Sequence, residues 1–379
     1  MRSGTRARKL WRVVGPLAIF ATLAAGCAGG EGDAADELAA SADEEGETFQ
    51  LTVGSGHTPP VPTSIKWVDE FLLPEIERRV SEETAHTVEF RRAFSGTVVG
   101  FNEVLSGTES GLIDIGHFAN PYESSNLPLH NLGFYVPFQS PDVGVVMQAM
   151  RDTYEKNPEL GAVFEEEFGQ RVIARWGISN YGLVSTFEWD DLSDLDGVQV
   201  GAVGPNLDWL DSTGAVPVQS DISEWYTSLQ TGVFEAAIVF LESVPGLNLH
   251  EVAPYYAEID FGAMPIGTLT INNQTWDDLP DDVRSIISEV AAEFEETLPE
   301  QVREVEERAL DIMTEEGATV LEISDEARSD WANRLPNLAA QRAEEAEGRG
   351  LPGKKAIEDY IASQEEQGHT FPRRWDVDG

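Results

Sequence analysis

Apolar and polar residues alternate or cluster along the chain in patterns that predict strands and helices in turn. The expected strands are residues 49–53, 87–90, 111–118, 171–177, 182–186 and 198–203. Between the first two of them, residues 63–84 have the apolar spacing of a helix, and Pro74 should kink it. Strands that alternate with helices over this length predict an α/β fold.

Further helices are expected in the second half of the chain. Residues 281–298 carry an apolar stripe at helical spacing, and Pro280 precedes them at a position where proline is tolerated. A separate, charged helix should follow over about residues 300–316. Residues 336–379 should add one or two more helices and an irregular tail.

The first 26 residues have the order of a secretory signal peptide. Five basic residues lie among the first twelve, and residues 13–25 are mostly apolar, a run too short to span a bilayer. Small residues then lead to Cys27 in a sequence that resembles a lipoprotein processing site, so we expect a lipid on this thiol. The alternative is a plain signal peptide followed by an incidental cysteine. Residues 27–47 are mostly small or acidic and should form a disordered acidic tether.

The mature chain is strongly acidic. Removal of the signal peptide takes away five basic residues and no acidic ones, which leaves 20 basic against 68 acidic residues and a net charge of −48. Electrostatic repulsion excludes nucleic acid as a partner. The charge is spread along the chain and only four lysines remain, a pattern that favours adaptation to high external salt over recognition of one charged partner.

Motifs of common catalytic and metal sites are missing from the sequence. It contains no Gly-x-Ser-x-Gly nucleophile elbow and no phosphate-binding loop, and Cys27 is its single cysteine. The six histidines do not have metal-ligand spacing. We therefore expect a protein that is not an enzyme and that needs neither a cofactor nor a metal.

Several segments occur in the order typical of one transport family. Residues 194–200, 214–218 and 223–232 are the most distinctive, and residues 107–115, 126–138 and 276–280 add support. Together they resemble the solute receptors of tripartite ATP-independent periplasmic (TRAP) transporters, the dicarboxylate-binding-protein family. The resemblance covers about residues 49–335, and the shared order of the segments makes it specific.

The resemblance implies a two-lobed, hinge-closing α/β receptor of the periplasmic-binding-protein type (type II-like), braced by a long helix. Lobe I would comprise about residues 48–178 and 264–299, lobe II about residues 179–263 and 300–335, and residues 336–379 would form a C-terminal helical extension. Such a receptor captures a small organic solute outside the cytoplasmic membrane and delivers it to permease subunits. The alternatives are a sensory receptor with the same fold and, less favoured, an exported enzyme on this scaffold.

Three positions depart from the family pattern where relatives hold a solute carboxylate. Gly201 stands where the family has a clamping arginine, Tyr181 where many members have a second arginine, and Val239 where they have an asparagine. Glycine offers no side-chain donor in place of a bidentate guanidinium. We therefore expect that simple C4-dicarboxylates do not bind tightly.

Other side chains near the expected cleft would make up for these losses. Arg175, Arg91 or Arg92 would supply a relocated cation, although Arg175 also suits an ion pair between the lobes; otherwise the solute is neutral, zwitterionic or cationic. Aromatic rings would stack on a solute ring or surround a cation, and Glu242 would meet a cationic solute, although each ring alone also suits a core. The predicted ligand-contact residues are His57, His117, Asn120, Arg175, Trp176, Tyr181, Gly201, Trp209, Trp225, Val239, Phe240 and Glu242.

The acidic composition predicts that salt stabilises the protein. Raising salt from low to molar concentration should raise the melting temperature, because the Debye length shrinks to about 3 Å at 1 M and screens the repulsion among carboxylates. Thermal unfolding of the mature domain across a salt series measures this effect. A melting temperature that stays flat or falls would contradict salt adaptation.

Overall fold

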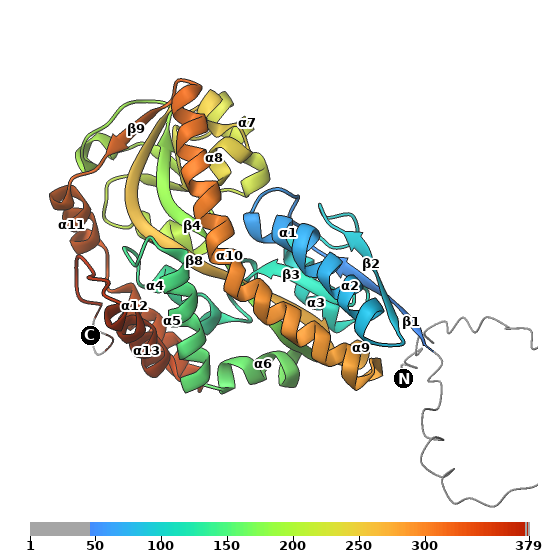
Figure 1. The fold of residues 1–379 in the computed structure, drawn as a ribbon. Coiled ribbons are helices and arrows are strands. Elements are labelled where there is room, and N and C mark those ends of the chain that lie inside the picture. Colours follow the sequence, from blue (N-terminus) through green and yellow to red (C-terminus); the bar gives the residue numbers. More distant parts are fainter. Residues whose placement is uncertain (1–45, 376, 378–379) are drawn as a thin grey trace, which may run out of the picture.

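The computed structural model describes residues 46–375 and residue 377, and Figure 1 shows its fold. The strands are β1 (Thr48–Gly54), β2 (Thr87–Ala93), β3 (Ile115–Ala119), β4 (Gln170–Ser185), β5 (Gln199–Ala202), β6 (Val216–Gln219), β7 (Ala236–Phe240), β8 (Tyr255–Asn272) and β9 (Thr319–Glu322). The helices are α1 (Thr63–Trp67), α2 (Leu73–Glu83), α3 (Val104–Glu109), α4 (Leu132–Tyr135), α5 (Val143–Lys156), α6 (Glu159–Phe168), α7 (Trp225–Thr231), α8 (Ser243–Gly246), α9 (Asn273–Asp278), α10 (Asp281–Glu315), α11 (Asp325–Arg334), α12 (Leu338–Gly348) and α13 (Gly353–Glu366).

The strands of the described chain are hydrogen-bonded in the order β2-β1-β3-β8-β4-β7-β5-β6, and β9 pairs with β8. Two strands, β4 with 16 residues and β8 with 18, are long enough to pair with other strands toward both ends of this sheet. Toward one end β8 pairs with β3, and toward the other β4 pairs with β7. Figure 1 shows the result: β1–β3 and β5–β7 form two groups of strands that are connected through β4 and β8.

A single strand, β4, occupies the stretch for which the sequence predicted two strands over 171–177 and 182–186. The expected break fell on Ser179 and Asn180, which interrupt the apolar pattern. The backbone stays extended there because β4 remains paired with β8, although the register shifts between Trp176 and Leu183. Tertiary pairing therefore overrides the local polar signal, and the sheet runs without a gap between the two groups of strands.

Strand β8 changes direction beside these irregular pairs. Its Asp260 and Gly262 have positive φ angles of 57° and 108°. The Asn180 side chain on β4 is bonded to both residues, because its Nδ2 donates to Asp260 Oδ1 (2.7 Å) and its Oδ1 accepts from the Gly262 amide (3.0 Å). One amide side chain thus holds the two long strands together where their regular ladder is interrupted.

Helix α10 runs along both groups of strands (Figure 1). The sequence predicted two helices, over 281–298 and 300–316, but the structure has one helix of 35 residues with Pro299 inside it. A proline in a helix interior removes one main-chain hydrogen bond. The loss is tolerated here because Leu298, Pro299 and Val302 are all buried, so packing holds the helix on both sides of the proline.

The N-terminal helical region contains the distortion that Pro74 predicted. Helices α1 and α2 are joined by a π turn at Val68–Leu72, and the helix ends at Glu83. Because proline has no N–H to donate to the preceding turn, a wider π turn is a regular way to accommodate it.

The prediction of a strand over residues 111–118 was partly wrong. Only the part from Ile115 is a strand, since Gly111 has a φ of 68° and begins a turn.

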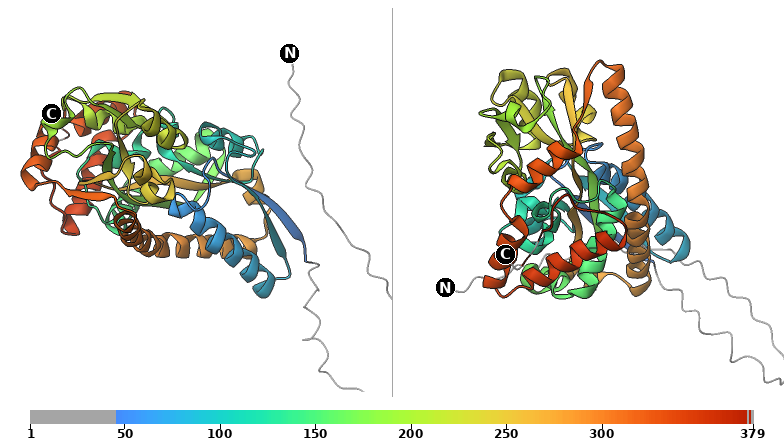
Figure 2. Two further views of the ribbon diagram at one scale, coloured as in Figure 1. Left: turned by 90° about the horizontal axis from the view of Figure 1, so that it is seen from above. Right: turned by 90° about the vertical axis from the view of Figure 1, so that its left-hand side faces the viewer.

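The C-terminal helices α12 and α13 confirm the helical extension expected after residue 335. Figure 2 shows them on the side of the molecule that carries α5. The Tyr360 hydroxyl donates to Gln139 Oε1 (2.5 Å), and Gln364 Oε1 accepts from the Ser140 amide (3.0 Å). These contacts fasten the extension to the segment between α4 and α5. Within the described residues, no helix is both long enough and apolar enough to cross a bilayer.

Candidate functional site

A cavity lies between the two groups of strands, and we call it the aromatic cavity. It is lined by His57, Pro62, Ala119, Pro121, Tyr122, Phe134, Trp176, Ile178, Tyr181, Val203, Asn206, Ile222, Trp225, Phe240 and Ile266. The segments after β1 and β3 supply one wall, and the segments after β5 and β7 supply the other. Ligands of open α/β sheets bind beyond the carboxyl ends of parallel strands, which is where these segments lie.

Four of the predicted aromatic side chains meet in this cavity. Tyr181 on β4 and Phe240 at the end of β7 have ring centroids 5.8 Å apart, and Trp225 on α7 lies 6.3 Å from Phe240. From the opposite wall, the His57 ring approaches Trp176 edge to face at 5.7 Å. The rings therefore come from four separate segments and surround one space, as stacking on a planar solute requires.

The position of Trp176 is fixed from behind. Its indole stacks on His117 at 4.5 Å, and His117 is held by Ser55 Oγ (3.2 Å) and Ser64 Oγ (3.1 Å). Gly267 on β8 leaves the room that the indole needs, because a Cβ there would lie 1.9 Å from a ring carbon. His117 thus supports the cavity wall without lining the cavity.

The titratable side chains that line the aromatic cavity are held in their neutral forms. Burial lowers the pKa of His57 to about 3, so its imidazole is uncharged at physiological pH. Burial also raises the pKa of Tyr122 and Tyr181, which keeps both hydroxyls protonated. In the described part of the chain, no Asp, Glu, Lys or Arg lines this cavity.

Three buried N–H groups on the lining residues have no partner, and one of them is the indole Nε1 of Trp176, which is 1% exposed. Asn206 and Trp225 are each 2% exposed, and neither Asn206 Nδ2 nor Trp225 Nε1 makes a hydrogen bond within the described structure. A buried donor without a partner costs about 1–3 kcal/mol. Such donors are expected where a bound molecule completes the hydrogen bonding. Sequence reasoning missed Asn206, because a single asparagine in a connecting segment carries no distinctive pattern.

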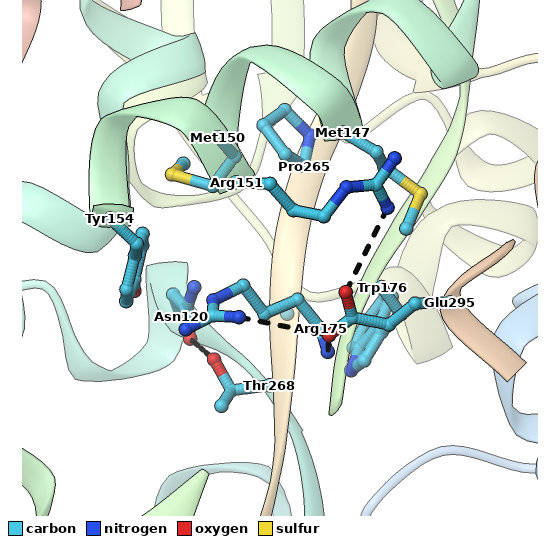
Figure 3. Close-up of a pocket in the computed structure, with 11 residues that line it drawn as sticks. Asn120, Met147, Met150, Arg151, Tyr154, Arg175, Trp176, Pro265, Thr268 and Glu295 are labelled. Carbon is cyan, nitrogen blue, oxygen red and sulfur yellow. Dashed lines mark hydrogen bonds and ion pairs between the residues drawn. The ribbon is translucent and has the colours of Figure 1, made fainter. Parts of the chain in front are cut away.

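Arg175 lines a second cavity, which shares Trp176 with the aromatic cavity (Figure 3). Its guanidinium lies 3.7 Å from Glu295 Oε1 and packs over the Tyr154 ring at 3.9 Å. Arg151 reaches the same carboxylate at 3.8 Å. The predicted relocated cation is therefore engaged in an ion pair with α10, the alternative that the sequence left open. Arg175 is not among the residues that line the aromatic cavity.

Asn120 also lines the second cavity and is fully occupied by the fold. Its Nδ2 donates to the His130 carbonyl oxygen (3.0 Å), and its Oδ1 accepts from Thr268 Oγ1 (3.0 Å). The residues that follow it, Pro121 and Tyr122, line the aromatic cavity instead. The segment after β3 therefore reaches the aromatic cavity through Pro121 and Tyr122, and not through the predicted His117 and Asn120.

Three further predicted residues line neither cavity. Gly201 faces the Phe234 ring, which would lie 2.7 Å from a Cβ, so the protein core fills the space that a side chain at this position would need. Val239 pairs with Gly182 inside the sheet, and Trp209 donates from its indole to the Phe134 carbonyl oxygen (3.0 Å). Gly201 and Val239 thus serve packing around β5 and β7, and Trp209 packs in the core against Phe134 and Phe261.

The two alternative arginines lie on β2, away from both cavities. Arg91 is exposed, and Arg92 is paired with Asp69 at 2.5 Å on the surface. Neither residue is part of the lining of the aromatic cavity or of the second cavity. No relocated cation is therefore present in the aromatic cavity within the described residues.

Glu242 forms a buried contact between the two groups of strands. It follows β7, is 2% exposed, and accepts hydrogen bonds from the amide (3.1 Å) and the hydroxyl of Thr63, the first residue of α1. Its other carboxyl oxygen, Oε1, has no partner in the described structure. Burial raises the pKa of Glu242 to about 7, Thr63 lowers it, and the nearby Glu306 raises it further.

The fold, with a cavity between two groups of strands, is that of an extracellular solute-binding protein. Residues 70–345 match the family model described as DctP, bacterial extracellular solute-binding protein, family 7. This match covers more than half of the chain, so the chain belongs to this family. Membership in a family of solute-binding proteins agrees with the prediction that the chain is not an enzyme.

Curated relatives are similar over part of their length. The C4-dicarboxylate-binding periplasmic protein DctP of Rhodobacter capsulatus is 28% identical over 148 residues, which cover 39% of this chain and 44% of that protein. A solute-binding protein of Chromohalobacter salexigens is 25% identical over 228 residues, covering 58% of this chain and 65% of that protein. The matches therefore span less than two thirds of each of these two relatives.

Solved structures confirm the predicted α/β receptor fold. A TRAP periplasmic solute-binding protein of Desulfovibrio salexigens has a TM-score of 0.71 at 22% identity, covering 84% of this chain and 97% of that one. One from Rhodoferax ferrireducens, in complex with copurified benzoate, has a TM-score of 0.72 at 16% identity, with 84% and 98% covered. A marine metagenome protein specific for aromatic acid ligands, in complex with 3-hydroxybenzoate, has a TM-score of 0.73 at 17% identity, with 85% and 99% covered.

The buried carboxyl of Glu242 predicts a loss of stability as pH rises. Between pH 4.5 and about 7 the unfolded chain releases this proton while the folded chain keeps it, so the free energy of unfolding falls over that interval and levels off above it. Each pKa unit corresponds to about 1.4 kcal/mol. Glu242→Gln should therefore make the melting temperature less dependent on pH between 4.5 and 7.

The matched control is Glu307→Gln, which makes the same change of charge at an exposed position of α10. It should leave the slope of melting temperature against pH close to that of the wild type. Equal slopes for wild type and Glu242→Gln would show that Glu242 is already ionised in the folded state.

Proposed function

We propose that this chain is the extracytoplasmic solute receptor of a TRAP-type secondary transporter, and that it captures one small organic solute in the aromatic cavity. The observation that carries the proposal is the placement of that cavity. Its walls come from both groups of strands, so a bound solute would contact both and favour their approach. We also propose that the receptor delivers its solute to membrane permease subunits, and the support is the fold it shares with TRAP solute-binding proteins.

The division into lobes is proposed along the predicted boundaries. Lobe I would comprise about residues 48–178 and 264–299, and lobe II about residues 179–263 and 300–335. The first two crossings fall beside the irregular pairing of β4 with β8 and beside the positive φ angles in β8. The third falls at Pro299, where α10 lacks a main-chain hydrogen bond. Each crossing thus coincides with a local weakness in the regular structure.

The proposed solute contacts are the predicted residues that line the aromatic cavity, namely His57, Trp176, Tyr181, Trp225 and Phe240. To these we add Asn206, whose unpartnered N–H offers a hydrogen bond. His117 is proposed to act through Trp176, and Glu242 through its contact with Thr63. The remaining predicted positions are not proposed as direct contacts.

Binding by the proposed receptor is tested by a thermal-shift screen of small organic solutes at high salt. A solute that binds only the folded state stabilises it by about 2.7 kcal/mol at a concentration of 100 Kd. Phe240→Ala should abolish the shift given by each such solute, because it removes one wall of the cavity. Phe71→Ala is the matched control, since Phe71 stacks on Trp67 at 4.9 Å and does not line the cavity.

Two results would contradict the proposal. One is a screen in which no organic solute stabilises the protein. The other is a solute whose shift survives Phe240→Ala as well as it survives Phe71→Ala, which would place its binding site outside the aromatic cavity.

We propose further that Cys27 carries a lipid and that residues 27–47 tether the receptor to the outer face of the cytoplasmic membrane. The signal peptide, Cys27 and the tether up to residue 45 lie outside the described residues. The support is the small-residue run that leads to the single cysteine. Cys27→Ser should release the protein into the soluble fraction, because a hydroxyl does not form the thioether. Membrane fractionation of cells that express the full chain measures this, and a variant that stays with washed membranes would exclude the anchor.

A further inference from the structure

The lining of the aromatic cavity offers no counter-charge to an anion. None of the described residues that line it is an arginine or a lysine, and the low pKa of His57, about 3, keeps its ring neutral. Arg175 is committed to Glu295 and lines the second cavity instead. A carboxylate moved from water into such a space loses its hydration without a cation to replace it, which is strongly unfavourable.

A cation is disfavoured in the same cavity for a different reason. Aromatic faces attract cations, but no carboxylate is among the lining residues, and Glu242 is held by Thr63 beyond the lining. The unpartnered buried polar atoms on its lining residues are three donors, Asn206 Nδ2, Trp225 Nε1 and Trp176 Nε1, whose hydrogens carry partial positive charge. These donors repel a cation and need an acceptor.

We infer that the solute is an uncharged planar ring compound with hydrogen-bond acceptors, such as a carbonyl oxygen, that are bound by Asn206 and Trp225 between the aromatic walls. This inference rests on the proposed receptor function and specifies the chemical class of its solute. It separates this chain from the solved structures of similar fold that contain bound acids, benzoate and 3-hydroxybenzoate among them. The walls stack on the ring, and the two donors fix its orientation.

Three compounds of nearly equal size and shape isolate the effect of charge. Benzamide is neutral, benzoate is an anion and benzamidine is a cation, and all three place a trigonal carbon on the same ring. Calorimetric titration should give a dissociation constant for benzamide at least about tenfold lower than for either ion, since the neutral compound avoids the desolvation penalty of a charge. Succinate, an aliphatic dianion, should bind more weakly than benzamide.

The titrations are to be made at molar salt. The net charge of −48 after removal of the signal peptide would otherwise repel benzoate and attract benzamidine from a distance. At about 1 M salt the Debye length is about 3 Å, so the order of affinities reports the cavity and not the surface. The same condition suits an acidic chain.

Two variants test the assigned contacts. Asn206→Leu removes one donor and keeps the volume close, so it should weaken benzamide about fivefold to tenfold and leave benzene, which has no acceptor, unchanged. Arg175→Gln is the control and should leave benzamide binding unchanged, because the guanidinium belongs to the second cavity. The melting temperature of each variant without ligand checks that it is folded.

The outcomes separate this inference from the receptor function. Tighter binding of benzoate than of benzamide overturns the charge class while the chain remains a receptor, and its loss in Arg175→Gln would identify a relocated clamp. Failure of benzamide to bind at millimolar concentration, with another solute stabilising the protein, also overturns the class alone. A screen in which no organic solute stabilises the protein removes the receptor function itself.

Discussion

The antiparallel pairing of β4 with β8 is the interaction on which the rest of the molecule depends. Strand β8 pairs with β3 and β9, and strand β4 pairs with β7. The strands that carry the two walls of the aromatic cavity are therefore attached to this central pair. A regular ladder over 16 residues would make a stiff connection. The shifted register between Trp176 and Leu183 and the side-chain bonds of Asn180 replace part of that ladder. The connection is therefore continuous in hydrogen bonding but locally irregular where the walls meet.

The same stretch of β4 also explains the chemistry of the cavity. Arg175 and Trp176 both line the second cavity, but only Trp176 also lines the aromatic cavity. Arg175 reaches Glu295 on α10, and Trp176 forms part of the aromatic wall. Arg175 is therefore a neighbour of the aromatic wall in sequence, but it is not among the residues that line the aromatic cavity. At Gly201 the Phe234 ring occupies the space that a side chain would fill, so substitution by arginine there would disturb the core.

Much of the fold was predictable because local patterns and tertiary structure agree. The strand at 49–53 and the helical apolar stripe after Pro280 both follow from their periodicity. The errors occurred where tertiary packing overrides a local signal. Asn180 locally favours a break in the strand, but its bonds to β8 keep the strand continuous. Pro299 locally favours the end of a helix, but the burial of its neighbours keeps α10 continuous. The alternation of apolar residues within β8 gave no clear signal, because nearly the whole strand is buried and both of its faces are apolar.

The candidate site was predictable in kind but not in detail, for a related reason. Five aromatic residues were expected near the cleft, and four of them, Trp176, Tyr181, Trp225 and Phe240, line the aromatic cavity. Trp209 has the same residue type and a similar sequence context, yet it packs against Phe134 and Phe261 in the core. Side-chain direction within a connecting segment depends on contacts that sequence spacing does not specify.

Helix α10 adds a second connection between the two groups of strands, and its contacts with β4 show how the connection is made. Glu295 accepts a hydrogen bond from the main-chain amide of Arg175 (2.5 Å), and Glu306 accepts one from the amide of Asn180 (2.8 Å). These two carboxylates lie on either side of Pro299, whose missing N–H leaves the Glu295 carbonyl without its usual helical partner. The helix is thus bonded to β4 on both sides of its own weakest turn. The bonds of Glu295 and Glu306 hold α10 to β4 on both sides of Pro299. A change in the angle between the two groups of strands therefore requires β4, β8 and the turn of α10 at Pro299 to bend together.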